Sequence, residues 1–137
     1  MARRFKLILL STVTDERGRI TIAQEPDHVP FDVGRMFIID GVPRGATRAG
    51  HAHREQHELV FMIQGECTAV IDDGDAQENL RLNRLEMALY IPPMTWLELS
   101  DFSEDAVCGV LASGRYDRSG YISDVTEFRQ LAVRAGS

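Results

Sequence analysis

The segment Gly45-Ala-Thr-Arg-Ala-Gly-His-Ala-His-Arg-Glu-Gln-His-Glu-Leu-Val-Phe-Met-Ile-Gln-Gly65 places a pair of histidines shortly before an apolar run. His51 and His53 are two positions apart, so on a β-strand both side chains point to the same face. Glu58 follows with four residues between it and His53. Two imidazoles and a carboxylate that converge can bind a divalent metal ion. Imidazoles can also transfer protons near neutral pH or serve as ordinary core or surface residues, and the spacing alone leaves these alternatives open.

Short apolar segments separated by turn residues occupy most of the chain on both sides of this stretch. They predict strands at Phe5–Leu10, Arg19–Ala23, Arg35–Asp40, Leu59–Gln64, Cys67–Ile71, Asn79–Leu82, Met87–Ile91, Thr95–Leu99 and Ala106–Ala112. Asp73-Gly74 predicts a hairpin with a type I′ turn, because glycine accepts the positive φ that this turn requires. Many short strands with regular turns are typical of an all-β sandwich or barrel. No repeat or charge block divides the chain, so residues 1–137 are expected to form a single domain.

The segment Tyr121–Arg134 has helical periodicity instead of alternation. Its apolar positions on one helical face are Val125, Phe128, Leu131 and Ala132. Asp124 as the N-cap, with Glu127 three residues later, predicts a capping box. We therefore expect a mostly β domain with a C-terminal α-helix.

The composition excludes several classes of partner and location. A net charge of −6 argues against nucleic acid as the main partner. No apolar run approaches the ~18 residues that span a bilayer, so no membrane segment is expected. Residues 1–10 lack the cleavage site of a signal peptide and are interpreted as a first strand, which predicts a cytoplasmic protein. Cys67 and Cys108 lie far apart in apolar segments and are expected to be buried, reduced thiols.

The spacing around the histidine pair, Gly-x5-His-x-His-x4-Glu-x6-Gly, resembles the first motif of the cupin superfamily. This resemblance implies a double-stranded β-helix, or jelly-roll barrel. The second cupin motif would place another ligand histidine where this chain has Leu97, in Ile91-Pro-Pro-Met-Thr-Trp-Leu97. Because that ligand is missing, we expect no metal and no other cofactor. A metal site with three protein ligands, His51, His53 and Glu58, is the alternative, because catalytic metals keep open positions.

Over residues 5–131 the chain also resembles the WxcM-like sugar 3,4-ketoisomerases, in four segments that occur in the same order. They are Asp15–Gly18 with Pro30, Phe31 and Arg35; Arg48–Arg54; Asp72–Gly74 with Leu89–Ile91 and Trp96; and Asp101–Ser103 through Leu111–Ser113, Tyr116–Asp117, Tyr121–Ile122 and Phe128. The resemblance implies isomerisation of dTDP-4-keto-6-deoxyglucose without a metal, in a deoxysugar biosynthesis route. A base removes the C3 proton beside the C4 ketone, an enediol forms, and a proton returns at C4.

The resemblance also implies which residues do this work. His51 and His53 match the catalytic pair, and histidine supplies an acid and a base near neutral pH without a large pKa shift. The arginines that match positions in or around the nucleotide-sugar pocket are Arg17, Arg35 and Arg48. Arginine suits a diphosphate because its planar fork makes bidentate contacts. Tyr90 and Trp96 are expected to line the barrel wall, where an aromatic face can stack on a thymine or sugar ring.

A homodimer is expected, because small cupins pair edge strands and so protect them, and Phe5–Leu10 is the strand expected to pair with the partner. Two further histidines are expected to lie outside the pocket. His57 adjoins Glu58 and should face the opposite side of its strand, and His28 lies in a loop that we expect to be solvated.

Several positions depart from the family pattern. Relatives carry a tyrosine in the run where this chain has Phe37 and Ile38, a polar residue where it has Leu97, and glutamine where it has Glu58. These departures leave the exact sugar nucleotide open, and the sequence does not indicate the stereochemistry at C4. Two alternatives to the isomerase remain: a metal-dependent cupin enzyme, and a cupin that binds a nucleotide sugar without chemistry.

Overall fold

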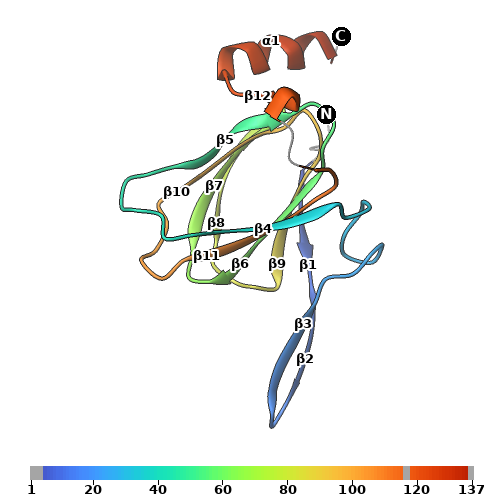
Figure 1. Ribbon diagram of the computed structural model, residues 1–137, viewed down its shortest axis with the longest axis vertical. Helices are drawn as coiled ribbons and strands as arrows, with labels where there is room; N and C mark the ends of the chain where they lie inside the picture. The colour runs from blue at the N-terminus through green and yellow to red at the C-terminus, as the bar shows by residue number, and fades with distance from the viewer. Residues whose placement is uncertain (1–4, 116–117, 136–137) are drawn as a thin grey trace.

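The computed structural model describes residues 5–115 and 118–135, which form a mostly β domain (Figure 1). Its strands are β1 Lys6–Leu9, β2 Ser11–Asp15, β3 Gly18–Ile22, β4 Arg35–Asp40, β5 Arg48–His53, β6 Glu58–Gln64, β7 Cys67–Asp72, β8 Gln77–Leu82, β9 Met87–Ile91, β10 Trp96–Ser100, β11 Val107–Ala112 and β12 Tyr121–Ile122. A 3₁₀ turn, η1, covers Arg118–Gly120, and the helix α1 covers Val125–Ala135. Among the described residues, no helix has the length and apolar character needed to cross a membrane.

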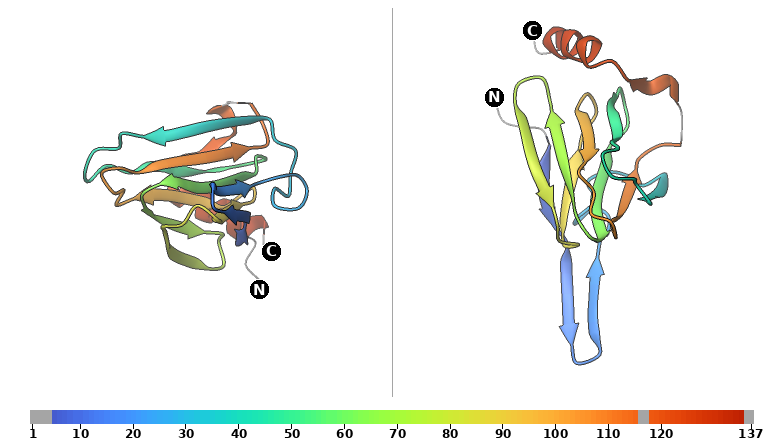
Figure 2. Two further views of the ribbon diagram at one scale, coloured as in Figure 1. Left: turned by 90° about the horizontal axis from the view of Figure 1, so that it is seen from below. Right: turned by 90° about the vertical axis from the view of Figure 1, so that its left-hand side faces the viewer.

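Two five-stranded sheets face each other across the core, in the orders β1-β9-β6-β11-β4 and β12-β5-β10-β7-β8. Neighbours within each sheet are mostly distant along the chain, so the chain passes repeatedly from one sheet to the other (Figure 2). All strand pairs are antiparallel in the described residues. This arrangement confirms the expected all-β cupin-like fold with a C-terminal helix.

The core between the sheets is built by alternation along each strand. Val60 and Met62 of β6 point inward, while Leu59 and Phe61 pack on the outer side of the same sheet. The two thiols lie in this core, and burial raises the pKa of Cys67 to about 11 and that of Cys108 to about 12. The expectation of buried, reduced cysteines is therefore confirmed.

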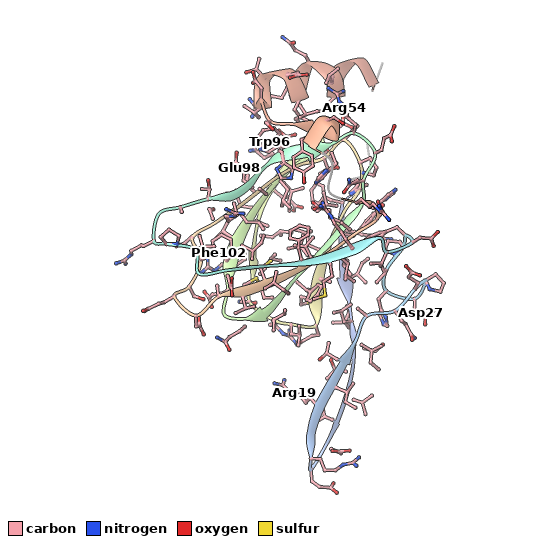
Figure 3. All side chains as sticks on the ribbon, in the orientation of Figure 1. Arg19, Asp27, Arg54, Trp96, Glu98 and Phe102 are labelled. Atoms are coloured by element: carbon pink, nitrogen blue, oxygen red, sulfur yellow. The ribbon has the colours of Figure 1, made fainter. Side chains whose placement is uncertain are left out.

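Helix α1 packs on the outer face of the second sheet, beyond one end of the barrel (Figure 1). Phe128, fully buried, contacts Trp96 with ring centroids 5.8 Å apart. The Asp124 carboxylate accepts a hydrogen bond from the Thr126 backbone N–H at 2.8 Å, which confirms the N-cap. The guanidinium of Arg54, which Figure 3 labels below α1, lies 3.5 Å from the Glu127 carboxylate.

The segment Tyr121–Arg134, which was assigned helical periodicity, begins three residues before its correctly predicted cap at Asp124. Tyr121 and Ile122 form the strand β12, which pairs with His53 and Ala52 of β5. The backbone groups of these two residues therefore bond to a neighbouring strand, and the helix begins only after the Asp124 cap.

The β2–β3 hairpin projects away from the body, at the opposite end from α1 (Figures 1 and 2). Its first strand, Ser11–Asp15, was not predicted, because Ser-Thr-Val-Thr-Asp contains a single apolar residue and gives little apolar signal. β1 pairs with β9 of the same chain, so one of its two edges is already used within the molecule. That leaves only the other edge of the predicted pairing strand available to a partner.

Two local expectations are wrong. The β7–β8 hairpin is present, but Asp72 pairs with Gln77, so the loop holds the four residues 73–76 instead of a two-residue turn. The Asp72 and Asp73 carboxylates support this longer loop by accepting hydrogen bonds from the backbone N–H groups of residues 74–76. His28 is only 7 % exposed, because its ring nitrogens contact the Ser11 hydroxyl at 2.8 Å and the Gln24 N–H at 3.2 Å.

Candidate active site

A β-bulge in β5 positions the side chains at the site. Leu97 pairs with His51, and Leu99 pairs with Arg48. Over this stretch β5 therefore contains one more residue than β10. Ala49 and Gly50 take up the extra length with φ values of +65° and +75°. Residues three apart would face opposite sides of a regular strand, but the bulge turns Arg48 and His51 to the same, inward face.

The two imidazoles meet in the barrel together with a tyrosine. The His51 and His53 ring centroids lie 4.8 Å apart with the planes at 84°. Tyr121 stacks on His51 at 4.4 Å and meets the His53 ring edge-on at 4.5 Å. Because Tyr121 pairs with His53 in the strand register, these rings project from adjacent strands on one face. The sequence prediction that His51 and His53 share a face is confirmed.

Glu58 and His53 form a buried contact at the base of the site. The His53 Nε2 atom lies 3.4 Å from Glu58 Oε2, and both side chains are about 95 % buried. Neither ring nitrogen of His53 has a hydrogen-bond partner among the described residues. Buried polar atoms without a partner are uncommon in proteins, and they occur at functional sites.

A cavity of about 610 Å³ opens in front of His51, within the range that accommodates a small-molecule ligand. Apolar side chains of both sheets form much of its wall, among them Phe37, Leu97 and Leu99. Arg35 and Arg48 also line it and place two positive charges at its wall. The Arg35 guanidinium lies 5.1 Å from the centre of the Phe37 ring and 3.4 Å from the Gln56 side-chain oxygen, which orients it.

Burial sets the protonation of His51. Desolvation lowers the pKa of His51 below its usual 6.5, and the nearby His53 and Arg35 lower it further. Glu58 and a hydrogen bond with the Ala49 backbone act in the opposite direction. The lowered pKa favours the neutral imidazole at neutral pH, and the neutral form is the one that can accept a proton.

Arg17 is not near this cavity in its own chain. It lies at the tip of the β2–β3 hairpin, where its guanidinium bonds to the Asp15 carboxylate at 2.7 Å and its side chain is 84 % exposed. Figure 1 shows this tip at the far end of the molecule from β5 and β12.

The two aromatic residues that were predicted for the pocket also lie elsewhere. Trp96 points to the outer face beneath α1, and its indole N–H donates to Glu98 at 3.1 Å (Figure 3). Tyr90 packs on the outer face of the first sheet with Phe31, and its hydroxyl lies 2.7 Å from His57 Nδ1. His57 therefore faces away from the cavity, as predicted. Alternation explains both aromatics, because their neighbours Leu97, Leu89 and Ile91 take the inward positions.

Tyr121 was missed as a site residue. Its segment contributed to the family resemblance, but it was interpreted as the start of a helix. The available signal was the isolated Tyr-Ile pair directly before a helix cap, which is compatible with a short strand. Tyr116 and Asp117 of the same resemblance lie outside the described residues.

Comparison with known proteins identifies the family of this chain. The family model described as FdtA: WxcM-like, C-terminal matches residues 3–133, so the chain belongs to this family. The chain is 31 % identical over 129 residues to a TDP-4-oxo-6-deoxy-α-D-glucose-3,4-oxoisomerase from Aneurinibacillus thermoaerophilus, covering 94 % of this chain and 93 % of that protein.

Two solved structures show the same likeness. A sugar 3,4-ketoisomerase from Thermoanaerobacterium thermosaccharolyticum in complex with TDP is 30 % identical, with a TM-score of 0.92 and 98 % of both chains covered. A TDP-fucose-3,4-ketoisomerase from Campylobacter jejuni is 27 % identical, with a TM-score of 0.90, 95 % of this chain and 96 % of that chain covered.

Proposed function

We propose that the protein is a sugar-nucleotide 3,4-ketoisomerase that converts a dTDP-4-keto-6-deoxyhexose to its 3-keto isomer. The observation that carries this proposal is the placement of His51, with a lowered pKa, at a cavity whose wall also holds Arg35 and Arg48. Relatives of the same family support the substrate class. A histidine-to-asparagine variant of the T. thermosaccharolyticum enzyme, 29 % identical, is in complex with TDP-4-keto-6-deoxyglucose.

The histidine pair serves the carbon atoms of the substrate in this proposal. Neutral His51 removes the proton from C3, beside the C4 ketone, and the electron pair forms the C3–C4 double bond of an enediol. Return of a proton to C4 then completes the isomerisation. His53 is the second acid–base group, and its contact with Glu58 holds it next to His51.

The arginines serve the diphosphate. Arg48 projects inward beside His51 because of the bulge, and Arg35 lies on the opposite sheet. A guanidinium makes bidentate contacts with phosphate oxygens, so two of them can hold the diphosphate while the sugar lies at His51.

The test is incubation with dTDP-4-keto-6-deoxyglucose in D₂O, followed by proton NMR. We expect a 3-keto product that carries deuterium at C4, because the enediol is reprotonated by a group in exchange with solvent. His51→Asn should lower turnover by about 10²–10⁴-fold. Binding without turnover or exchange by the wild type would support a non-catalytic cupin instead, and a fully active His51→Asn protein would contradict the histidine mechanism.

A metal-dependent enzyme is the second candidate, because donor atoms of His51, His53 and Glu58 lie within 4.8 Å of one another. The residue types fit a divalent transition metal, but ligands about 2.0–2.2 Å from one ion lie closer together than this, so the side chains would have to converge. We expect activity to survive exhaustive EDTA dialysis, with the metal content verified by elemental analysis. Activity that vanishes and returns with one added divalent ion would establish a metal-dependent enzyme instead.

A homodimer is part of the proposal. The hairpin exposes Val13 and Ile20, which pair across its two strands and share one face, and Leu9 at its base is 66 % exposed. Such an apolar face on a projecting hairpin suits packing against a second copy. Because Arg17 lies far from its own cavity, it can bind substrate only in the cavity of the partner. A cytoplasmic location stays a prediction from the sequence.

A further inference from the structure

Tyr121 is in contact with both catalytic histidines, yet the mechanism above gives it no part. Its ring stacks on His51 with an interplanar angle of 25° and meets His53 at 83°. The side chain also lines the cavity and is only half buried, so a ligand in the cavity can reach it.

The position of this ring is fixed by the residues on either side of it. Ile122, 1 % exposed, packs into the cluster of Ala52, Trp96 and Phe128 beneath α1. The backbone pairs with β5 at His53 and Ala52, and the Asp124 cap starts α1 directly afterwards. The phenol is therefore held beside the imidazoles by the core and not by a mobile loop.

The reaction moves two protons, not one. A carbon-bound proton leaves C3 and another reaches C4, and in addition the hydroxyl proton on O3 must leave while O4 gains one. The imidazoles serve the carbon atoms, so the oxygen atoms need another donor and acceptor. A phenol can donate its proton to one oxygen and accept a proton from another.

We propose that Tyr121 carries the proton between the two substrate oxygens, an inference that rests on the proposed isomerase function. When His51 takes the C3 proton, the C4 carbonyl π bond breaks and O4 receives its electron pair. The Tyr121 hydroxyl donates its proton to O4, which gives the enediol, and the phenolate then accepts the proton of O3. As the C3–O3 double bond forms, the C3–C4 π electrons take a proton from the imidazolium at C4, and Tyr121 is again neutral.

Other groups at the cavity fit this role less well. Glu58 lines the cavity, but it is only 5 % exposed and its Oε2 lies 3.4 Å from His53 Nε2, whereas Tyr121 is half buried and touches both imidazole rings. The Arg35 and Arg48 guanidinium groups have N–H donors and no acceptor atom, so neither can accept the O3 proton. Ser123 lies at the exposed edge of the cavity, beyond β12.

The experiment compares two rates in D₂O with dTDP-4-keto-6-deoxyglucose: exchange of the C3 hydrogen in recovered substrate, and formation of the 3-keto product. Tyr121→Phe keeps the ring stack and removes only the hydroxyl. We expect product formation to fall by about 10²-fold or more, because it needs the proton carried from O3 to O4. Exchange at C3 should fall less, because it needs only His51 and the enolate that forms before Tyr121 donates, so the ratio of exchange to product rises. Tyr121→Leu also removes the stack and should lower both rates.

The ratio separates the proton-transfer role from a structural one. A poorly folded or misplaced site lowers both rates together and leaves the ratio unchanged, and this result for Tyr121→Phe would overturn the inference. An unchanged rate of product formation in Tyr121→Phe would also overturn it. Wild-type protein that shows neither exchange nor product would contradict the proposed function itself, and with it the inference.

Discussion

His51 illustrates how the environment of one residue prepares it for chemistry. An imidazole in water titrates near pH 6.5, where half of the molecules are already charged. Burial against the cavity wall and the neighbouring His53 and Arg35 lower this pKa, while Glu58 raises it. The net lowering of the pKa keeps His51 neutral and able to accept a proton. The charge of the Glu58 carboxylate limits how far this pKa is lowered.

The pH dependence of kcat/KM should report this balance. We expect an acid limb with a midpoint below 6.5, because protonated His51 cannot act as the base. Glu58→Gln removes the negative charge that raises the pKa of His51, so its acid limb should move to lower pH. Glu104→Gln, in an exposed loop, is the matched control and should leave the limb in place. A limb that moves to higher pH in Glu58→Gln would contradict this electrostatic reading.

Melting curves at each pH separate catalysis from stability. The pKa of His51 is lower in the folded chain than in the unfolded chain, so the unfolded chain binds a proton first as the pH falls below 6.5. The folding stability contributed by the neutral His51 is fully present above pH 6.5. It is lost as the pH falls from 6.5 through the lower pKa of His51 in the folded chain. The kinetic limb should therefore be measured well below the melting temperature.

At the level of elements, the bulge in β5 determines which side chains meet in the cavity. Ala49 and Gly50 both adopt the left-handed region, which costs an alanine roughly 1 kcal/mol relative to glycine. The arrangement persists because the pairing with β10 continues on both sides of the bulge. Without the extra residue, Arg48 and His51 would face opposite sides of the sheet.

Gly50→Ala tests the bulge directly. Nothing lies within 4 Å of a Cβ at position 50, so the cost comes from its φ of +75° and not from a clash. We expect a loss of about 1 kcal/mol in the free energy of unfolding, together with weaker activity as the bulge shifts. Gly41→Ala, with φ of +64° and equally open space, should lose similar stability and keep its activity. Equal activity of the two variants would contradict the prediction that the bulge positions the side chains of the active site.

At the scale of the whole molecule, the histidine pair and Arg17 lie at opposite ends of the chain's fold. The histidine pair and Tyr121 lie near α1, and the tip of the β2–β3 hairpin with Arg17 extends from the other end (Figure 1). A single copy cannot bring Arg17 to its own cavity in this arrangement. In a dimer in which each hairpin crosses to the partner, the apolar hairpin face would pack against the second copy. Arg17 would then lie at the cavity of the partner.

Subunit mixing should show whether Arg17 acts across such a dimer. We expect Arg17→Ala and His51→Asn proteins to be weakly active alone and to regain activity when they are unfolded and refolded together. About a quarter of wild-type activity should return, because half of the dimers are mixed and one of their two cavities is complete. A wild-type refolding control corrects for losses. No regain would contradict the crossed arrangement, and a monomer in sedimentation would contradict the dimer.

The features that depend on local alternation and spacing could be predicted from the amino-acid sequence. The predicted strands Arg35–Asp40 and Met87–Ile91 match β4 and β9 residue for residue. A strand can be recognised locally because its side chains alternate between the two faces with a period of two. The same period placed His51 and His53 on one face. Asp124 marked the start of α1, because capping is a contact within a few residues.

The distant residues that join that pair could be identified only from the folded arrangement of the strands. Tyr121 reaches the histidines because β12 pairs with β5, and Arg48 does so because a bulge shifts the register. Tyr90 and Trp96, which carried a family likeness, lie on outer faces because their neighbours occupy the core. Register, bulges and the face of a sheet that is covered depend on contacts between residues far apart in the chain, and a local pattern does not encode those contacts.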